Sequence, residues 1–304
     1  MRKRVGTVMR AFATTVVLTL LLSGCSGNAT PSAAPNALNI TTTTTVFADL
    51  IQNVGGSHVD VLSLVPKGGD VHTFDPSPSD ASAVSNADLV VMNGLGLDDW
   101  LTPFMQDTGN ATVPILKLGE GLTDVQYIAS DEGGPNPHLW MDPAYAREYV
   151  DRIRLKLDEV DPANQPDYDA NAAAYDAKLA ALDDYVKSQF ATIPEASRRL
   201  VAYHDAFPYY AREYAITIVG VVTPAPGQDP SAGQIADLIS EIKSSNVRLI
   251  LAEVQFPDQL VREIASDTGA KVESDLYDDA LTDTVPSYEQ MIRWDTDKIV
   301  EGLR

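Results

Sequence analysis

The chain of 304 residues contains only four histidines, and three of them share a similar sequence context. His72 lies in VHTFDPSPSD, His138 in NPHLWMDP and His204 in AYHDAFPYY, and each of these contexts contains both Asp and Pro. The fourth, His58, lacks such a context. Imidazole is the commonest metal ligand among protein side chains and is also a general acid or base. Three scarce imidazoles in polar, loop-forming sequences therefore indicate a metal site, provided that the fold brings them together.

Two of the three histidines follow strand-like sequences. VDVLSLVP (59–66) precedes His72, and RRLVAY (198–203) leads directly into His204. In open α/β sheets, ligands bind just beyond the carboxyl ends of strands. His138 is predicted in a loop that enters a helix. We expect the three side chains to converge in a cleft between two lobes.

Short apolar runs alternate with amphipathic stretches along the chain, which is typical of parallel βαβ units. LNITTTTTVF (38–47) is rich in β-branched residues and is predicted as a strand, whereas DPAYAREYVDRIRLKLDEV (142–160) has helical spacing. A chain of this length can bury two hydrophobic cores. We therefore expect two α/β lobes with parallel sheets, formed by residues 38–160 and 194–304.

A long helix is predicted between these lobes, within residues 161–193. Apolar residues recur there at steps of three and four, namely Tyr168, Ala172, Tyr175, Leu179, Leu182 and Val186. Pro166 and Pro194 suit the two helix boundaries. The expected helix covers about 25 residues, or roughly 38 Å. The alternative is a coiled-coil dimer, although the repeat lasts only about three heptads.

The N-terminus has the features of a secretory signal peptide over residues 1–24. A basic segment without acids precedes an apolar run, which is too short to span a bilayer with a stop-transfer flank. Cys25, the only cysteine, follows Ser23 and Gly24, as in the bacterial lipobox, so it is predicted to be lipidated; a single cysteine excludes an intrachain disulfide. Residues 25–37 are small, polar and Pro-containing and are predicted as a flexible tether. One acylated terminus would anchor the protein to the membrane surface without spanning it.

The formal net charge is −21, and removal of the basic signal segment makes it more negative still. Nucleic-acid binding requires clustered Lys and Arg, so nucleic acid is not an expected partner. An acidic surface also attracts cations, although acidic surfaces serve solubility as well.

The chain resembles the solute-binding lipoproteins of bacterial ABC importers for zinc and manganese. The matching segments are HTFDPSPSD, NPHLWMDP, YHDAFPYYAREY, PGQDPSAGQIADLI and DLYDDAL, and the similarity covers nearly the whole mature chain in the same order. The resemblance implies four metal ligands: His72, His138, His204 and Asp279. It also implies two α/β lobes joined by one long rigid helix, an ABC permease as partner and a monomeric protein that is held at the outer face of the cell membrane by its lipid.

Three neutral imidazoles and one carboxylate suit tetrahedral Zn²⁺. In the family, members tuned to manganese tend to carry glutamate at the third ligand position, where this chain has His204, so Zn²⁺ is predicted and Mn²⁺ remains the alternative. The His-rich loop of many zinc-type members is missing here, which puts a zinc-sequestering role in doubt. Asp275 and Asp278 lie near Asp279; if this segment is a strand, alternation places Asp275, Tyr277 and Asp279 on one face.

Each imidazole should donate its second N–H to a carboxylate or carbonyl group. Asp205 and Asp75 are near in sequence, Glu253 is expected in the second shell or the cleft lining, and Trp140 is expected to pack near the site. A zinc hydrolase is the rival hypothesis, but four ligands would close the coordination shell, and neither HExxH nor GxSxG occurs. A surface adhesin is a third class of function, and these residues argue neither for it nor against it.

Overall fold

The computed structural model describes residues 37–304 except 109, 111, 131, 132 and 226. The predicted signal peptide (1–24), the predicted lipidation site Cys25 and all but the last residue of the predicted tether (25–37) lie outside the described residues. Among the helices of the described part, none is both long and apolar enough to cross a bilayer.

Two four-stranded sheets form the two lobes, and every strand pairing within them is parallel. The strands of the first lobe are β1 (Leu38–Thr42), β2 (Val59–Ser63), β3 (Leu89–Met92) and β4 (Ile115–Lys117), in the order β2-β1-β3-β4. Those of the second lobe are β5 (Arg199–Ala202), β6 (Thr217–Val221), β7 (Leu249–Glu253) and β8 (Lys271–Leu276), in the order β6-β5-β7-β8. The predicted fold of two parallel α/β lobes is confirmed, and both lobes use the same strand order.

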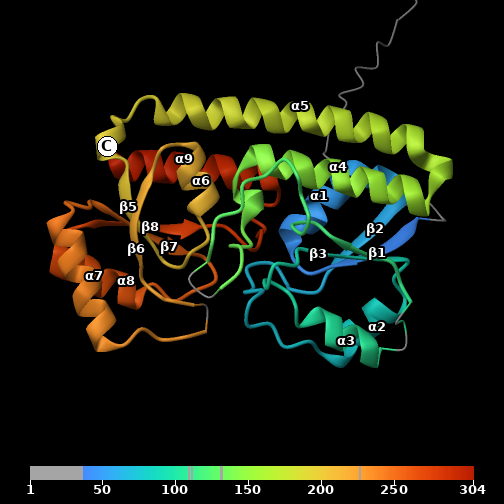
Figure 1. Cartoon of the computed structure of the whole chain (residues 1–304), viewed down its shortest axis with the longest axis horizontal. Helices are drawn as coiled ribbons and strands as arrows, with labels where there is room; N and C mark the ends of the chain where they lie inside the picture. Colours follow the sequence, from blue (N-terminus) through green and yellow to red (C-terminus); the bar gives the residue numbers. More distant parts are fainter. Residues whose placement is uncertain (1–36, 109, 111, 131–132, 226) are drawn as a thin grey trace, which may run out of the picture. The chain divides into compact units, whose positions relative to one another are not determined.

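Helices cover both faces of each sheet (Figure 1). The first lobe contains α1 (Thr45–Gly55), α2 (Pro78–Ser85), α3 (Leu101–Asp107) and α4 (Pro143–Val160), and the second contains α6 (Pro208–Glu213), α7 (Ala232–Ser244), α8 (Gln259–Thr268) and α9 (Tyr288–Leu303). Short 3₁₀ helices are η1 (Gly56–His58), η2 (Leu139–Met141), η3 (Pro162–Asn164) and η4 (Glu195–Ser197).

The central strands are apolar at successive positions because they are buried on both faces. In β3, Leu89 and Val91 join the large core, whereas Val90 and Met92 join the smaller core beneath α2 and α3. The strand period of two thus sends alternate residues into different cores.

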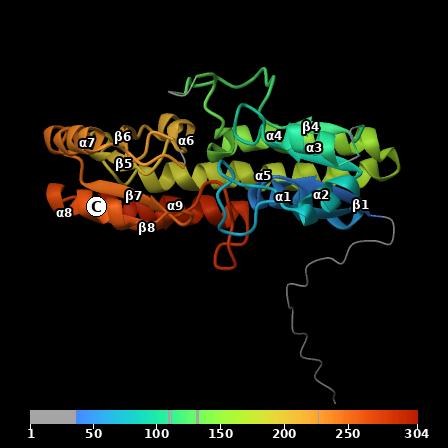
Figure 2. The same cartoon turned by 90° about the horizontal axis from the view of Figure 1, so that it is seen from below.

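Helix α5 (Gln165–Phe190) is the predicted long helix, and it lies alongside elements of both lobes (Figures 1 and 2). It packs against α1 and α4 of the first lobe and against α9 of the second. Its apolar stripe is buried within the chain; the buried residues are Tyr168, Ala172, Tyr175, Leu179, Leu182, Val186 and Phe190. Because the chain itself covers this stripe, the structure does not favour the coiled-coil alternative.

The strand predicted over residues 38–47 is too long. Strand β1 ends at Thr42, and Thr44 is the N-cap of α1, where its side-chain oxygen accepts a hydrogen bond from the backbone N–H of Phe47 at 3.3 Å. Threonine favours strands through its branched Cβ and favours N-caps through its hydroxyl, so a run of threonines does not mark the boundary.

The strand alternation proposed for Asp275 and Asp279 is also wrong. Strand β8 ends at Leu276, so Asp279 lies in the following loop. Asp275 is exposed and has a left-handed backbone (φ 64°), whereas Asp278 and Asp279 are fully buried.

We expect Leu179→Ala in α5 to lower the free energy of unfolding by about 2–5 kcal/mol, because it leaves a cavity in the core shared by α5 and the lobes. The matched control is Leu155→Ala on α4, where the leucine is 52% exposed and the expected change is within about 0.5 kcal/mol. Urea unfolding followed by circular dichroism measures both. Equal losses in the two variants would contradict the packing described for α5.

Candidate metal centre

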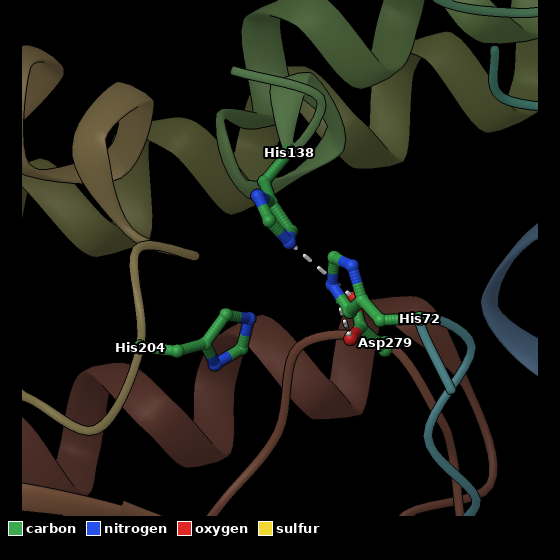
Figure 3. Close-up of side chains that lie close together, drawn as sticks. All are labelled: His72, His138, His204 and Asp279. Atoms are coloured by element: carbon green, nitrogen blue, oxygen red, sulfur yellow. Dashed lines mark ion pairs between the residues drawn. The ribbon is translucent and has the colours of Figure 1, made fainter. Parts of the chain in front are cut away.

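Four side chains from distant segments point toward one another (Figure 3). His72 lies in the loop between β2 and α2, and His138 immediately precedes η2 at the start of α4. His204 lies two residues beyond β5, and Asp279 lies three residues beyond β8. Two of the four therefore follow the carboxyl ends of strands in the second lobe, where α/β sheets bind ligands.

The ligand atoms are close enough together to share one ion. One atom from each of the four residues lies within 4.8 Å of the other three. Nε2 of His72 is 3.4 Å from one carboxylate oxygen of Asp279, and Nε2 of His138 is 3.7 Å from the other. In tetrahedral zinc sites, bonds of about 2.0–2.1 Å place the ligand atoms about 3.3–3.4 Å apart. The contacts of His72 and His138 with Asp279 are thus close to the spacing of ligand atoms around zinc, whereas the cluster as a whole is wider.

The same atoms are buried without hydrogen-bond partners. Nε2 of His72, His138 and His204 and both carboxylate oxygens of Asp279 lack a partner among the described residues. His138, His204 and Asp279 are at most 2% exposed. Buried polar groups are normally hydrogen-bonded, and each exception calls for an explanation. An ion at the centre of the cluster would satisfy all four residues at once, so the residues fit a metal ion.

The electrostatics of the cluster favour an anionic Asp279 and a neutral His138. Burial alone would raise the pKa of Asp279, but the three surrounding imidazoles lower it to about 2. Burial is also the main reason why the pKa of His138 lies well below its usual value. Metal ligands must be deprotonated, so both residues are in the protonation state that binding needs.

The pKa of His204 shifts in the opposite direction, because two carboxyl groups lie next to its Nδ1. Its Nδ1 lies 2.6 Å from Oε2 of Glu253 and 3.5 Å from Oδ2 of Asp278. Burial lowers the pKa of His204, but Glu253 and Asp278 outweigh burial and raise the pKa to about 10. Burial, followed by the charges of Asp279 and Glu253, raises the pKa of the Asp278 carboxyl well above its usual value.

Two ligand histidines are oriented by a polar residue two positions earlier. A carboxylate oxygen of Asp70 accepts the backbone N–H of His72 at 3.0 Å. The side-chain oxygen of Asn136 accepts the backbone N–H of His138 at 3.0 Å and lies 3.1 Å from its Nδ1. The sequence analysis did not identify Asp70 or Asn136. Asp and Asn side chains that accept a hydrogen bond from the backbone two residues later are nevertheless a known turn signal.

The residues expected to support the histidines differ in how directly they contact them. Glu253 contacts His204 directly, whereas Asp205 stands one step behind His138, because Nδ2 of Asn136 donates to the Asp205 carboxylate at 3.0 Å. Asp75, the other acid considered, is exposed, and Asp70 holds the His72 backbone instead.

Trp140 is buried next to the cluster, with its ring centroid 5.2 Å from that of His138. Its Nε1 donates to the backbone carbonyl of Asp278 at 2.9 Å, so it ties the His138 segment to the Asp279 segment. His58 lies elsewhere, 2.8 Å from a carboxylate oxygen of Asp167 and packed edge-on against Tyr168.

A cavity of about 920 Å³ opens beside the cluster. The three imidazoles line it together with residues of both lobes, such as Leu97 and Val222. Asp279 does not line this cavity, so the imidazoles form its inner wall and the carboxylate lies behind them.

Two α/β lobes with a candidate metal site between them are an architecture that fits a solute-binding protein. Residues 40–302 match the family described as zinc-uptake complex component A, periplasmic, and the chain belongs to this family. The family consists of solute-binding proteins of ABC importers, so the chain is not an enzyme.

Similar proteins agree with this placement. The manganese-binding lipoprotein MntA of Halalkalibacterium halodurans is 29% identical over 292 residues, which cover 95% of this chain and 96% of the relative. The iron-binding protein YfeA of Yersinia pestis is 30% identical over 277 residues, which cover 90% of this chain and 88% of the relative. The solved structure of the periplasmic zinc-binding protein TroA from Treponema pallidum has a TM-score of 0.82 at 24% identity, covers 88% of this chain and 99% of its own, and shows the same fold.

The raised pKa of His204 predicts how the stability of the metal-free protein depends on pH. The pKa of His204 is about 10 in the folded chain, against 6.5 for a free imidazole. The protonated imidazole therefore stabilises the folded state fully below pH 6.5, and this stabilisation is lost as the pH rises through 10. The difference in unfolding free energy between wild type and His204→Gln should therefore shrink over this range. Urea titrations in chelator measure it, and a difference that grows with pH would contradict the assignment.

Proposed function

We propose that this protein captures Zn²⁺ outside the cytoplasmic membrane and passes it to the membrane permease of an ABC importer. The observation that carries the proposal is the convergence of five buried atoms from His72, His138, His204 and Asp279, none of which has a hydrogen-bond partner in the described part of the chain. A cluster of this kind fits an ion, and its opening onto a cavity fits a cargo that is bound and released. The family, described as zinc-uptake complex component A, supplies the uptake context.

Zinc is proposed over manganese because of the ligand types. Imidazole nitrogen suits zinc, carboxylate oxygen suits manganese, and a shared N/O site binds zinc more tightly in any case. Relatives at 29–30% identity are named for manganese and for iron, so membership of the group does not decide the ion. Three nitrogens against one carboxylate are the basis for choosing zinc here.

The position of Glu253 is unsuited to the rival hydrolytic reaction. Its carboxylate contacts Nδ1 of His204 at 2.6 Å, whereas the nitrogen of that ring without a hydrogen-bond partner is Nε2. A general base would have to reach a metal-bound water directly.

Outside the site, the proposal includes membrane attachment through Cys25 and a monomeric protein. The name of the relative MntA includes the word lipoprotein, and the in-chain burial of the α5 stripe supports a monomer. We further propose that residues 38–160 and 194–304 act as two lobes, with 161–193 as the rigid link between them.

The function is tested by titrating zinc into the purified, chelator-treated protein. Loss of a residue that only supports a ligand weakens metal binding by about 10–100-fold. We expect a larger loss of zinc affinity from each of the substitutions His72→Ala, His138→Ala and His204→Ala. His58→Ala is the matched control, because this histidine lies outside the cluster. At about 1,000 times Kd, zinc should stabilise the wild type by about 4 kcal/mol, seen as a rise in Tm. If the Tm of the wild type does not change when zinc is added, the proposal is refuted.

Metal choice should depend on residue 204. His204→Glu replaces a nitrogen ligand by oxygen and should reduce zinc affinity more than manganese affinity, narrowing the ratio between them. Competition titrations of both ions on both proteins measure this ratio. If the zinc preference stays unchanged or widens, residue 204 does not determine the selectivity.

Attachment should depend on Cys25 alone. Cys25→Ser should move the protein from the membrane fraction to the soluble fraction while leaving zinc affinity unchanged, because the described fold begins only at residue 37. Fractionation of cells followed by immunoblotting checks this. A variant that stays with the membrane would point to another anchor.

A further inference from the structure

A divalent ion in the cluster would leave a charge imbalance among its ligands. Asp279 is the only carboxylate among the four residues, and the imidazoles are neutral when they coordinate. The site is almost fully buried, and an uncompensated charge in a low-dielectric interior is costly. One negative charge beyond that of Asp279 is needed for neutrality.

Glu253 lies where it can supply this charge through His204. Its Oε2 is 2.6 Å from Nδ1 of the imidazole, and both side chains are at most 1% exposed. Its other oxygen, Oε1, lies 3.5 Å from the backbone N–H of His204. Glu253 ends β7 and His204 follows β5, and these are neighbouring strands of one sheet. The pair is therefore held by the sheet itself.

His138 has a different support. Its Nδ1 lies 3.1 Å from the side-chain oxygen of Asn136, which is a neutral amide. The longer distance and the neutral partner give this imidazole an orienting hydrogen bond without an added charge. The two imidazoles thus differ in their second partner, although both are placed as ligands.

We propose that Glu253 is a positioning residue for the metal centre, acting through His204 and supplying the second negative charge that the bound ion needs. This inference rests on the proposed function. Glu253 accepts a hydrogen bond from Nδ1–H of His204, which leaves Nε2 to face the ion. The hydrogen-bonded pair then behaves as a nitrogen ligand that carries a negative charge.

Asp278 is less well placed for this role. Its Oδ2 is 3.5 Å from Nδ1 of His204, and its Oδ1 accepts hydrogen bonds from the backbone N–H of Asp279 at 2.6 Å and from the side chain of Gln255. These contacts tie Asp278 to the loop that carries Asp279. Its function is to shape that loop.

Two substitutions separate charge from shape. Glu253→Gln keeps an oxygen and the size of the side chain but removes the charge, whereas Glu253→Asp keeps the charge on a shorter side chain. Glu241→Gln on α7 is the matched control for a lost glutamate charge outside the cluster. We expect Glu253→Gln to raise the Kd for zinc by about 10–100-fold, with a smaller loss in Glu253→Asp and none in Glu241→Gln.

Two further readouts distinguish a supporting role from a ligand role. Because Glu253→Gln removes charge and keeps the ligand atoms, zinc and manganese affinities should fall by similar factors, unlike the expected result for His204→Glu. The visible absorption of bound Co²⁺ reports its coordination geometry; it should persist in Glu253→Gln and change in His204→Ala.

The outcomes separate this inference from the function on which it rests. Failure of the wild type to bind zinc would overturn both. Wild-type binding together with a Glu253→Gln Kd within about threefold of the wild-type value would overturn the inference alone. A Co²⁺ spectrum altered as strongly by Glu253→Gln as by His204→Ala would overturn it as well, by making Glu253 a ligand.

Discussion

Five buried polar atoms that face one another, without hydrogen-bond partners among the described residues, are the constraint on which this structure depends. A buried polar group left unsatisfied costs about 1–3 kcal/mol, so the metal-free protein keeps its cluster at a considerable cost. That cost is recovered when an ion binds, and ligand binding then becomes folding stability. The surrounding fold has to be rigid enough to prevent the four residues from turning away toward water or toward other partners.

Rigidity at Asp279 comes from bonds that its loop makes with the other lobe. Trp140 donates to the carbonyl of Asp278, and the Tyr288 hydroxyl donates to the carbonyl of Trp140 at 2.6 Å. The backbone N–H of Leu281 donates to the Thr45 hydroxyl at 2.7 Å, at the start of α1. The residues after β8 therefore belong to the second lobe by sequence but are bonded to the first. This explains how a carboxylate from the C-terminal part of the chain comes to lie against His72 and His138.

The sequence was enough to predict the two parallel α/β lobes and α5, because strand and helix periodicities are local signals and Pro166 and Pro194 bracket the helix. It also indicated the four residues that converge, through their motif contexts. It did not predict that β8 stops at Leu276 or that the backbone of Asp275 is left-handed. Nor could it choose Glu253 as the partner of His204, since that contact joins two residues 49 positions apart in the sequence.

The three histidines differ in the sequence separation between each of them and the residue that orients it. Asp70 and Asn136 act from two residues away, so the loops containing His72 and His138 carry their own orienting groups. His204 depends instead on Glu253 across the sheet. A substitution in β7 can therefore change the electronic character of His204 without touching the ligand loops. The support of His204 is therefore separable from its placement, unlike that of the two histidines whose orienting groups share their loops.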